Sequence, residues 1–177
     1  MRFQIKNVVP STLLTILFLI ILEVLSTAML PMIGVSKYRL PFNILIILFL
    51  GFKLETSFLA ILILVVQYTH AFFSIEGWAS GTIAGIIVCT IISYLRDLMH
   101  FSSAGFTMLV TQLFQLVWFL IISVFFYIRF DNVEFLIEKF WRFIPESICI
   151  SLLSPLFFAL LDKIWKVRED GVLSDES

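Results

Sequence analysis

Six apolar runs separated by short polar segments organise the chain. They cover residues 8–30, 40–52, 58–73, 77–94, 101–128 and 144–161. A membrane-spanning helix needs about 20 apolar residues, so the second run, which ends at Lys53, needs tilt or loop residues to span. Because apolar and polar residues do not alternate as in strands, the pattern predicts an all-α integral membrane protein, a compact bundle of six transmembrane helices. We expect one domain, residues 1–161, and a polar tail, residues 162–177.

Composition makes the membrane the expected solvent for these helices. Of the 177 residues, 60% are hydrophobic and 14% are charged, and the mean hydropathy is +1.06, whereas about 25% of residues are charged in an average soluble domain. The net charge is −1, so no nucleic-acid partner is expected, because that partner requires a basic surface. Cys89 and Cys149 fall inside apolar runs and are interpreted as small buried residues rather than a disulfide or metal pair.

Basic residues in the polar segments predict the orientation, because Lys and Arg are retained on the cytoplasmic side. With both termini inside, the cytoplasmic side holds seven of the 12 basic residues and the outer side holds five. We therefore expect a multi-pass plasma-membrane protein with both termini in the cytoplasm.

A row of small residues marks the fourth run. Gly77, Gly81, Gly85, Cys89 and Ser93 recur every four residues, which keeps them near one face of a helix with about 3.6 residues per turn. Such rows allow two helix backbones to approach closely within lipid. The neighbour is expected to be a helix of the same chain, and the alternative is that part of the row receives a helix from a partner protein.

Several polar residues lie within the apolar runs, and their burial in lipid is costly enough to suggest a function. They are Glu23 in the first run, Gln67 in the third, Thr111, Gln112, Gln115 and Trp118 in the fifth, and Ser147, Ser151, Ser154 and Pro155 in the sixth. Hydrogen bonding between helices is the commoner role of such groups, and lining a small-molecule cavity is the alternative. Glu23 is expected either to meet Lys37 or Arg39 of the following segment or to mark a functional site.

Residues 129–143 are amphipathic rather than apolar. Asp131 and Glu134 resemble a capping box, and large apolar residues follow at helical spacing as far as Ile144. Trp and Phe side chains favour the headgroup region of a membrane. The segment therefore predicts a short interfacial helix on the outer surface, between the fifth and sixth spans.

Little in the chain could support catalysis. The two histidines, His70 and His100, lie near the ends of apolar runs, and neither an H-E-x-x-H nor a G-x-S-x-G motif occurs. We expect no catalytic residue, no metal site and no cofactor.

The order of these features resembles the MreD family of bacterial rod-shape-determining membrane proteins. The shared features are a small six-span chain, Leu40-Pro41-Phe42-Asn43 at the entry to the second span, Leu-Gly-Phe-Lys-Leu-Glu at residues 50–55, and a glycine-bearing fourth span. The last span is also similar, because Pro155 precedes its final turns. An acidic residue is expected near the end of the family's third span, where this chain has Gln67-Tyr68-Thr69-His70.

The resemblance implies a non-catalytic scaffold subunit of the cell-elongation complex that builds peptidoglycan. Its implied partners in the bacterial inner membrane are an MreC-like protein, the actin-like MreB, and RodA with its transpeptidase partner, and a second copy of this chain is a further alternative. The family is similar in fold to the substrate-binding subunits of energy-coupling-factor vitamin transporters, so the alternative function is a small-molecule carrier. Those subunits commonly carry an Ala-x-x-x-Ala row on the first span, and this chain has no such row near Ser26, Thr27 and Ala28.

Overall fold

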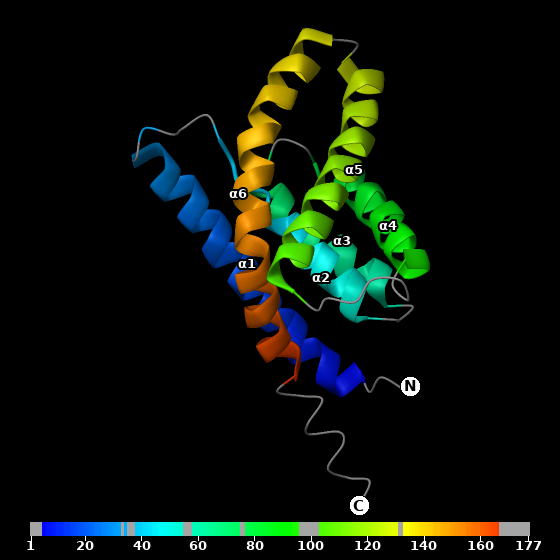
Figure 1. The fold of residues 1–177 in the computed structure, drawn as a ribbon. Helices are drawn as coiled ribbons and strands as arrows, with labels where there is room; N and C mark the ends of the chain where they lie inside the picture. The colour runs from blue at the N-terminus through cyan, green and yellow to red at the C-terminus, as the bar shows by residue number, and fades with distance from the viewer. Residues whose placement is uncertain are drawn as a thin grey trace, which may run out of the picture.

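A computed structural model describes residues 5–32, 34, 38–54, 58–74, 77–95, 103–130 and 133–166 of the chain. These residues form six helices and no strand (Figure 1). The helices are α1 (Ile5–Met32), α2 (Phe42–Lys53), α3 (Leu59–Ala71), α4 (Trp78–Leu95), α5 (Ala104–Phe130) and α6 (Val133–Lys166). The all-α prediction is therefore confirmed for the described part of the chain.

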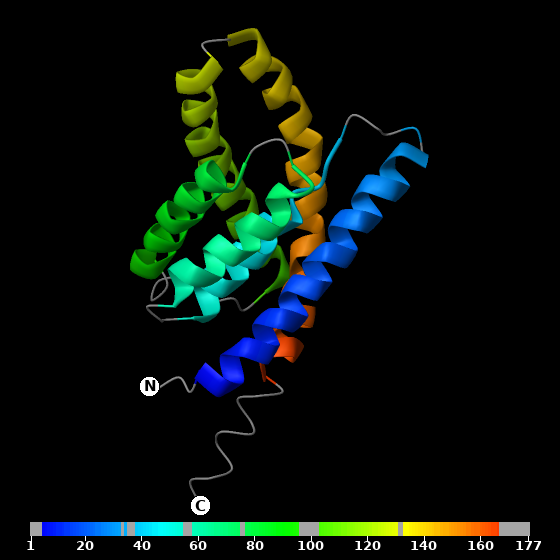
Figure 2. The ribbon, with the colours of Figure 1, turned by 180° about the vertical axis from the view of Figure 1, so that it is seen from behind.

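The short helix α2 lies at the centre of the bundle. Every residue from Phe42 to Gly51 is buried, and α2 contacts all five other helices. Figures 1 and 2 show α2 and α3 side by side, between α1 and α4. A helix that is apolar on all sides is typical of a position enclosed by other helices, which explains why the second run has no polar face.

Within the described ranges, four helices, rather than the predicted six, have the length and composition of a membrane span. These are α1, α4, α5 and α6. In contrast, α2 has 12 residues and α3 has 13, about 18 and 20 Å at a rise of about 1.5 Å per residue, whereas the hydrocarbon core is about 30 Å thick. The described residues thus form six helices, and four of these are long enough to cross a membrane.

The helices α5 and α6 form a long hairpin whose connected ends reach beyond the other helices (Figure 1). The predicted interfacial helix over residues 129–143 is wrong as a separate element, because residues 133–143 form the first turns of the 34-residue α6. The character of the sequence changes from amphipathic to apolar near Phe143 while the helix continues. Pro145 also lies inside α6, although a proline within a helix removes one backbone hydrogen bond and its ring crowds the carbonyl four residues earlier. Asp131 of the expected capping box lies outside the described residues.

The first residues of α1 and the last residues of α6 lie at the same end of the bundle in both views (Figures 1 and 2). Near this end, Lys53 Nζ of α2 pairs with Asp162 Oδ1 of α6 at 3.0 Å. Helix α6 continues to Lys166, so the expected polar tail, residues 162–177, starts within the last turns of this helix. Residues 167–177 lie outside the described part of the chain.

Candidate functional site

The small-residue row of α4 lies in part against helices of its own chain. A Cβ atom added to Gly81 would collide with the side-chain amide of Gln67 of α3, and one added to Gly85 would lie 2.6 Å from Ile63 Cγ2. Cys89 Sγ lies 3.7 Å from the carbonyl oxygen of Ile47 of α2. These three residues therefore allow α4 to approach α2 and α3 closely.

The two ends of the row do not share this contact. Gly77 precedes α4 at φ +76°, and its added Cβ atom would meet no atom within 4 Å. Ser93 is exposed, and its hydroxyl donates to the carbonyl of Thr90 at 2.7 Å. The five residues thus do not form one continuous packing face, because a four-residue spacing rotates steadily around a helix of about 3.6 residues per turn.

Four polar residues join α5 to α6 in what we call the Gln–Ser cluster: Gln112, Gln115, Ser147 and Ser151. Gln112 Nε2 donates to Ser147 Oγ at 3.0 Å, and Ser151 Oγ donates to Gln112 Oε1 at 2.7 Å. Gln115 Nε2 donates to Ser151 Oγ at 3.0 Å and to the Ser147 carbonyl at 3.3 Å. Side chains of the fifth and sixth predicted spans therefore hydrogen-bond to one another.

The remaining polar residues of these two helices have other surroundings. Ser154 Oγ donates to the Ser151 carbonyl at 2.8 Å within α6, and Pro155 is half-buried one residue further on. Thr111 is buried, and its hydroxyl has no hydrogen-bond partner in the described part of the chain. Trp118 is buried and faces a cavity described below.

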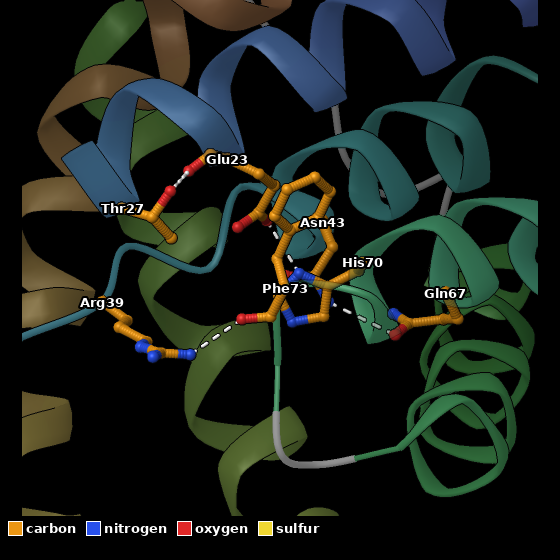
Figure 3. Close-up of polar contacts among 7 residues, drawn as sticks. All are labelled: Glu23, Thr27, Arg39, Asn43, Gln67, His70 and Phe73. Atoms are coloured by element: carbon orange, nitrogen blue, oxygen red, sulfur yellow. Dashed lines mark hydrogen bonds and ion pairs between the residues drawn. The ribbon is translucent and has the colours of Figure 1, made fainter.

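The intramembrane carboxylate Glu23 of α1 pairs with His70 of α3. A hydrogen bond of 2.7 Å joins Glu23 Oε1 to His70 Nδ1, and the two side chains are only 6% and 12% exposed. The predicted partner Arg39 instead donates from its guanidinium to the Phe73 carbonyl at 2.7 Å (Figure 3). The backbone N–H of Arg39 donates to Glu146 Oε1. The other predicted partner, Lys37, lies outside the described residues.

A second polar pair, Asn43 and Gln67, connects α2 to α3 beside the Glu23–His70 pair. Asn43 Nδ2 donates to Gln67 Oε1 at 3.4 Å (Figure 3). Both residues are 2% exposed, and neither Asn43 Oδ1 nor Gln67 Nε2 has a hydrogen-bond partner among the described residues. Because Gln67 also lies against Gly81, this pair links the α4 glycine face to α2.

The residues Glu23, Asn43 and His70 form the floor of a cavity of about 550 Å³, which we call the Glu23 cavity. Aromatic side chains from the segment after α3 and from α5 and α6 line its walls: Phe73, Trp118, Phe119, Phe126, Phe135 and Phe143. Charged side chains complete the lining: Arg39, Glu138, Lys139, Arg142 and Glu146. The volume and the mixed lining are typical of small-molecule sites.

Sequence reasoning did not anticipate the roles of His70 and Asn43 in this cavity. A carboxylate at membrane depth needs a partner, and His70 was the one histidine within an apolar run that could reach it from a neighbouring helix. Asn43 was noted only as part of a family motif. The feature of the sequence that could have indicated His70 was therefore the need of the Glu23 carboxylate for a hydrogen-bond partner. No spacing of residues along the chain indicated it.

Neither a metal-binding group of side chains nor a related protein helps to assign a function to the Glu23 cavity. No group of three His, Cys, Asp or Glu side chains within the described ranges could hold a metal ion. Cys89 is buried and Cys149 is exposed, and neither forms a disulfide within the described ranges. Comparisons with protein-family models, with curated proteins and with solved structures yield no match to this chain.

Proposed function

We propose that this chain is a non-catalytic scaffold subunit of the bacterial cell-elongation complex, held in the inner membrane and docking an MreC-like partner. RodA and its transpeptidase partner are further members of that proposed assembly. The resemblance of the Leu40–Asn43 entry, the residue 50–55 motif and the fourth-run glycines to the MreD family supports the proposal.

The proposed topology has six crossings and both termini in the cytoplasm. Helix ends nearest the two termini share one end of the bundle (Figures 1 and 2), as an even number of crossings requires. A short helix such as α2 is compatible with a crossing because its residues are enclosed by protein, where loop backbone at membrane depth is tolerated.

The observation that carries the scaffold proposal is the exposed tip of the α5–α6 hairpin. The 34 residues of α6 extend about 51 Å at about 1.5 Å per residue, whereas a bilayer with its headgroups is about 40–45 Å thick. At the tip, Trp141 is 67% exposed, Ile137 54% and Phe135 44%. Exposed aromatic anchors are typical of protein-binding hot spots, and anchoring in lipid headgroups is the competing role.

Alanine substitution of Trp141 tests this proposal against a matched control. Trp78 at the start of α4 is also exposed and serves as the control aromatic residue. We expect Trp141→Ala to leave membrane abundance unchanged, reduce co-purification with an MreC-like partner about tenfold or more, and round up rod-shaped cells, while Trp78→Ala does neither. Unchanged co-purification in Trp141→Ala would contradict the scaffold proposal. Loss of membrane abundance would assign the tip to lipid anchoring.

The Glu23 cavity favours a second candidate function, the small-molecule-binding subunit of an energy-coupling-factor type transporter. Its volume of about 550 Å³ suits a vitamin-sized ligand. Mass spectrometry of gently purified protein separates the two candidates, because a carrier would retain a vitamin at stoichiometric amounts and a scaffold would not. Neighbouring genes for an MreC-like protein would favour the scaffold, and a transporter ATPase gene would favour the carrier.

A further inference from the structure

The floor of the Glu23 cavity presents hydrogen-bond acceptors without partners. Glu23 Oε1 is bonded to His70, and no described residue donates to the second carboxylate oxygen of Glu23. Asn43 Oδ1 is buried and likewise has no partner. A buried polar atom left without a hydrogen bond costs about 1–3 kcal/mol. Glu23 and Asn43 come from different helices and both line one cavity, so a molecule bound there would lie against both residues.

The charges around the cavity favour a cationic donor over an anion. The guanidinium of Arg142 is paired with Glu138, Lys139 Nζ lies 4.0 Å from the centroid of the Phe126 ring, and Arg39 donates to the Phe73 carbonyl. These basic groups already have partners at the protein surface, where water screens charge. The Glu23 side chain, in contrast, is 6% exposed, and an acceptor in a low-dielectric site interacts strongly with a charged donor.

The aromatic walls add a place for an apolar body. Trp118 is 4% exposed and Phe119 is 9% exposed, and both lie along the cavity that begins at the polar floor. Aromatic faces attract ammonium groups electrostatically and also pack against apolar surface. The cavity therefore combines an acceptor floor with aromatic walls.

We propose that the Glu23 cavity binds a primary ammonium group carried on an apolar or aromatic body. The ammonium donates to the second carboxylate oxygen of Glu23, beside the Asn43 side chain, and the body packs against Trp118 and Phe119. His70 acts as a positioning residue that holds the Glu23 carboxylate. The test of this site is separate from the test of the scaffold role, because the proposed ligand contacts at Glu23, Trp118 and Phe119 do not include Trp141 of the hairpin tip.

Calorimetric titration of the purified full chain in detergent tests the proposal. Tryptamine supplies an ammonium on an aromatic body, and indole-3-propionate supplies a carboxylate on the same ring system. We expect tryptamine to bind and the carboxylate to bind at least about tenfold more weakly. Glu23→Gln should weaken tryptamine binding about tenfold or more, whereas Glu134→Gln, an exposed carboxylate of α6 outside the cavity, should leave the affinity unchanged.

A second measurement identifies the source of the ammonium group. In nanodiscs, phosphatidylethanolamine should weaken tryptamine binding relative to phosphatidylglycerol if the natural ligand is a lipid headgroup, and equal binding in both would indicate a water-soluble amine. Tighter binding of indole-3-propionate on the unmodified protein would overturn the proposal, and this comparison does not depend on how any variant folds. The same conclusion would follow if tryptamine failed to bind at millimolar concentration or if Glu23→Gln bound it as tightly.

Discussion

The Gln–Ser cluster and the Glu23 cavity use the same kinds of polar side chain in opposite ways. In the Gln–Ser cluster, four hydrogen bonds join two adjacent helices within a hairpin. The floor of the Glu23 cavity draws its residues from α1, α2 and α3, and Asn43 Oδ1 there has no partner. Buried polar groups therefore have two uses in this bundle, because one set holds two helices together and the other lines a cavity.

The spacing of the residues explains why only one of the two regions could be read from the sequence. Gln112 and Gln115 are three residues apart, and Ser147 and Ser151 are four apart, so each pair shares a helix face. Because α5 and α6 are sequence neighbours, contact between these faces is an expected arrangement. The floor residues of the cavity lie on three separate helices, so no single spacing relates them.

The largest expected effect comes from displacing α3, and α2 behind it, from the glycine face of α4. Gly85→Leu would place a side chain where a Cβ atom already lies 2.6 Å from Ile63 Cγ2 and 3.5 Å from Ile47 Cδ1 of α2. Overpacking of this kind costs about 1–3 kcal/mol and occasionally more. We expect a lower thermal midpoint in detergent and lower membrane abundance.

Gly105→Leu is the matched control for that prediction, because an added Cβ atom at Gly105 meets no atom within 4 Å. Its thermal midpoint should stay close to that of the unmodified protein. If Gly85→Leu instead kept full stability and lost an MreC-like partner, the glycine face would be a docking surface, contrary to its packing in the structure.

The next effect concerns the Glu23–His70 pair of the cavity floor. His70→Ala would leave the buried Glu23 carboxylate without its partner, which should cost about 1–3 kcal/mol of unfolding free energy. Unfolding of His70→Ala, Glu23→Leu and the double variant in mixed micelles measures the coupling between the two residues. We expect the double variant to be more stable than the sum of the single effects predicts. Strict additivity would mean that the 2.7 Å contact contributes nothing.

A smaller effect is expected in the Gln–Ser cluster. Gln115→Leu removes two hydrogen bonds to α6, and hydrogen bonds between membrane helices contribute about 0.6 kcal/mol on average. The loss of stability should therefore be about 1 kcal/mol, and tryptamine affinity should not change. A change in tryptamine affinity would show that the Gln–Ser cluster and the Glu23 cavity are coupled. The two regions would then not have the separate roles described above.

Sequence patterns predicted the positions of the helices well. They predicted poorly which of the helices are long enough to cross a membrane. All six apolar runs became helices because helical hydrogen bonding is the local solution for apolar segments. Hydropathy could not show that α2 is enclosed by protein, since enclosure and lipid contact select the same apolar side chains. The start of α6 was missed because a change from amphipathic to apolar character at Phe143 does not by itself end a helix.

Of the two predicted partners of Glu23, Arg39 was wrong for a related reason. Arg39 is much nearer to Glu23 in sequence than His70 is, and it lies in the segment that follows α1. Proximity along the chain is a poor guide once helices pack, because α3 brings His70 to α1 across 47 residues. Such contacts follow from the packing of whole helices, which local spacing does not encode.

The smallest effect we predict links the glycine face to the cavity. An added Cβ atom at Gly81 meets the side-chain amide of Gln67, the flexible end of a side chain that can move at little cost. Gly81→Ala should therefore change stability by less than about 1 kcal/mol, yet shift the Gln67 amide that holds Asn43 at the cavity floor. Tryptamine affinity should fall about threefold, which isothermal titration can resolve. Gly105→Ala, in open space, should leave the affinity unchanged. If Gly81→Ala bound tryptamine as tightly as the unmodified protein, Asn43 would hold its position without Gln67, and the cavity floor would be independent of α4.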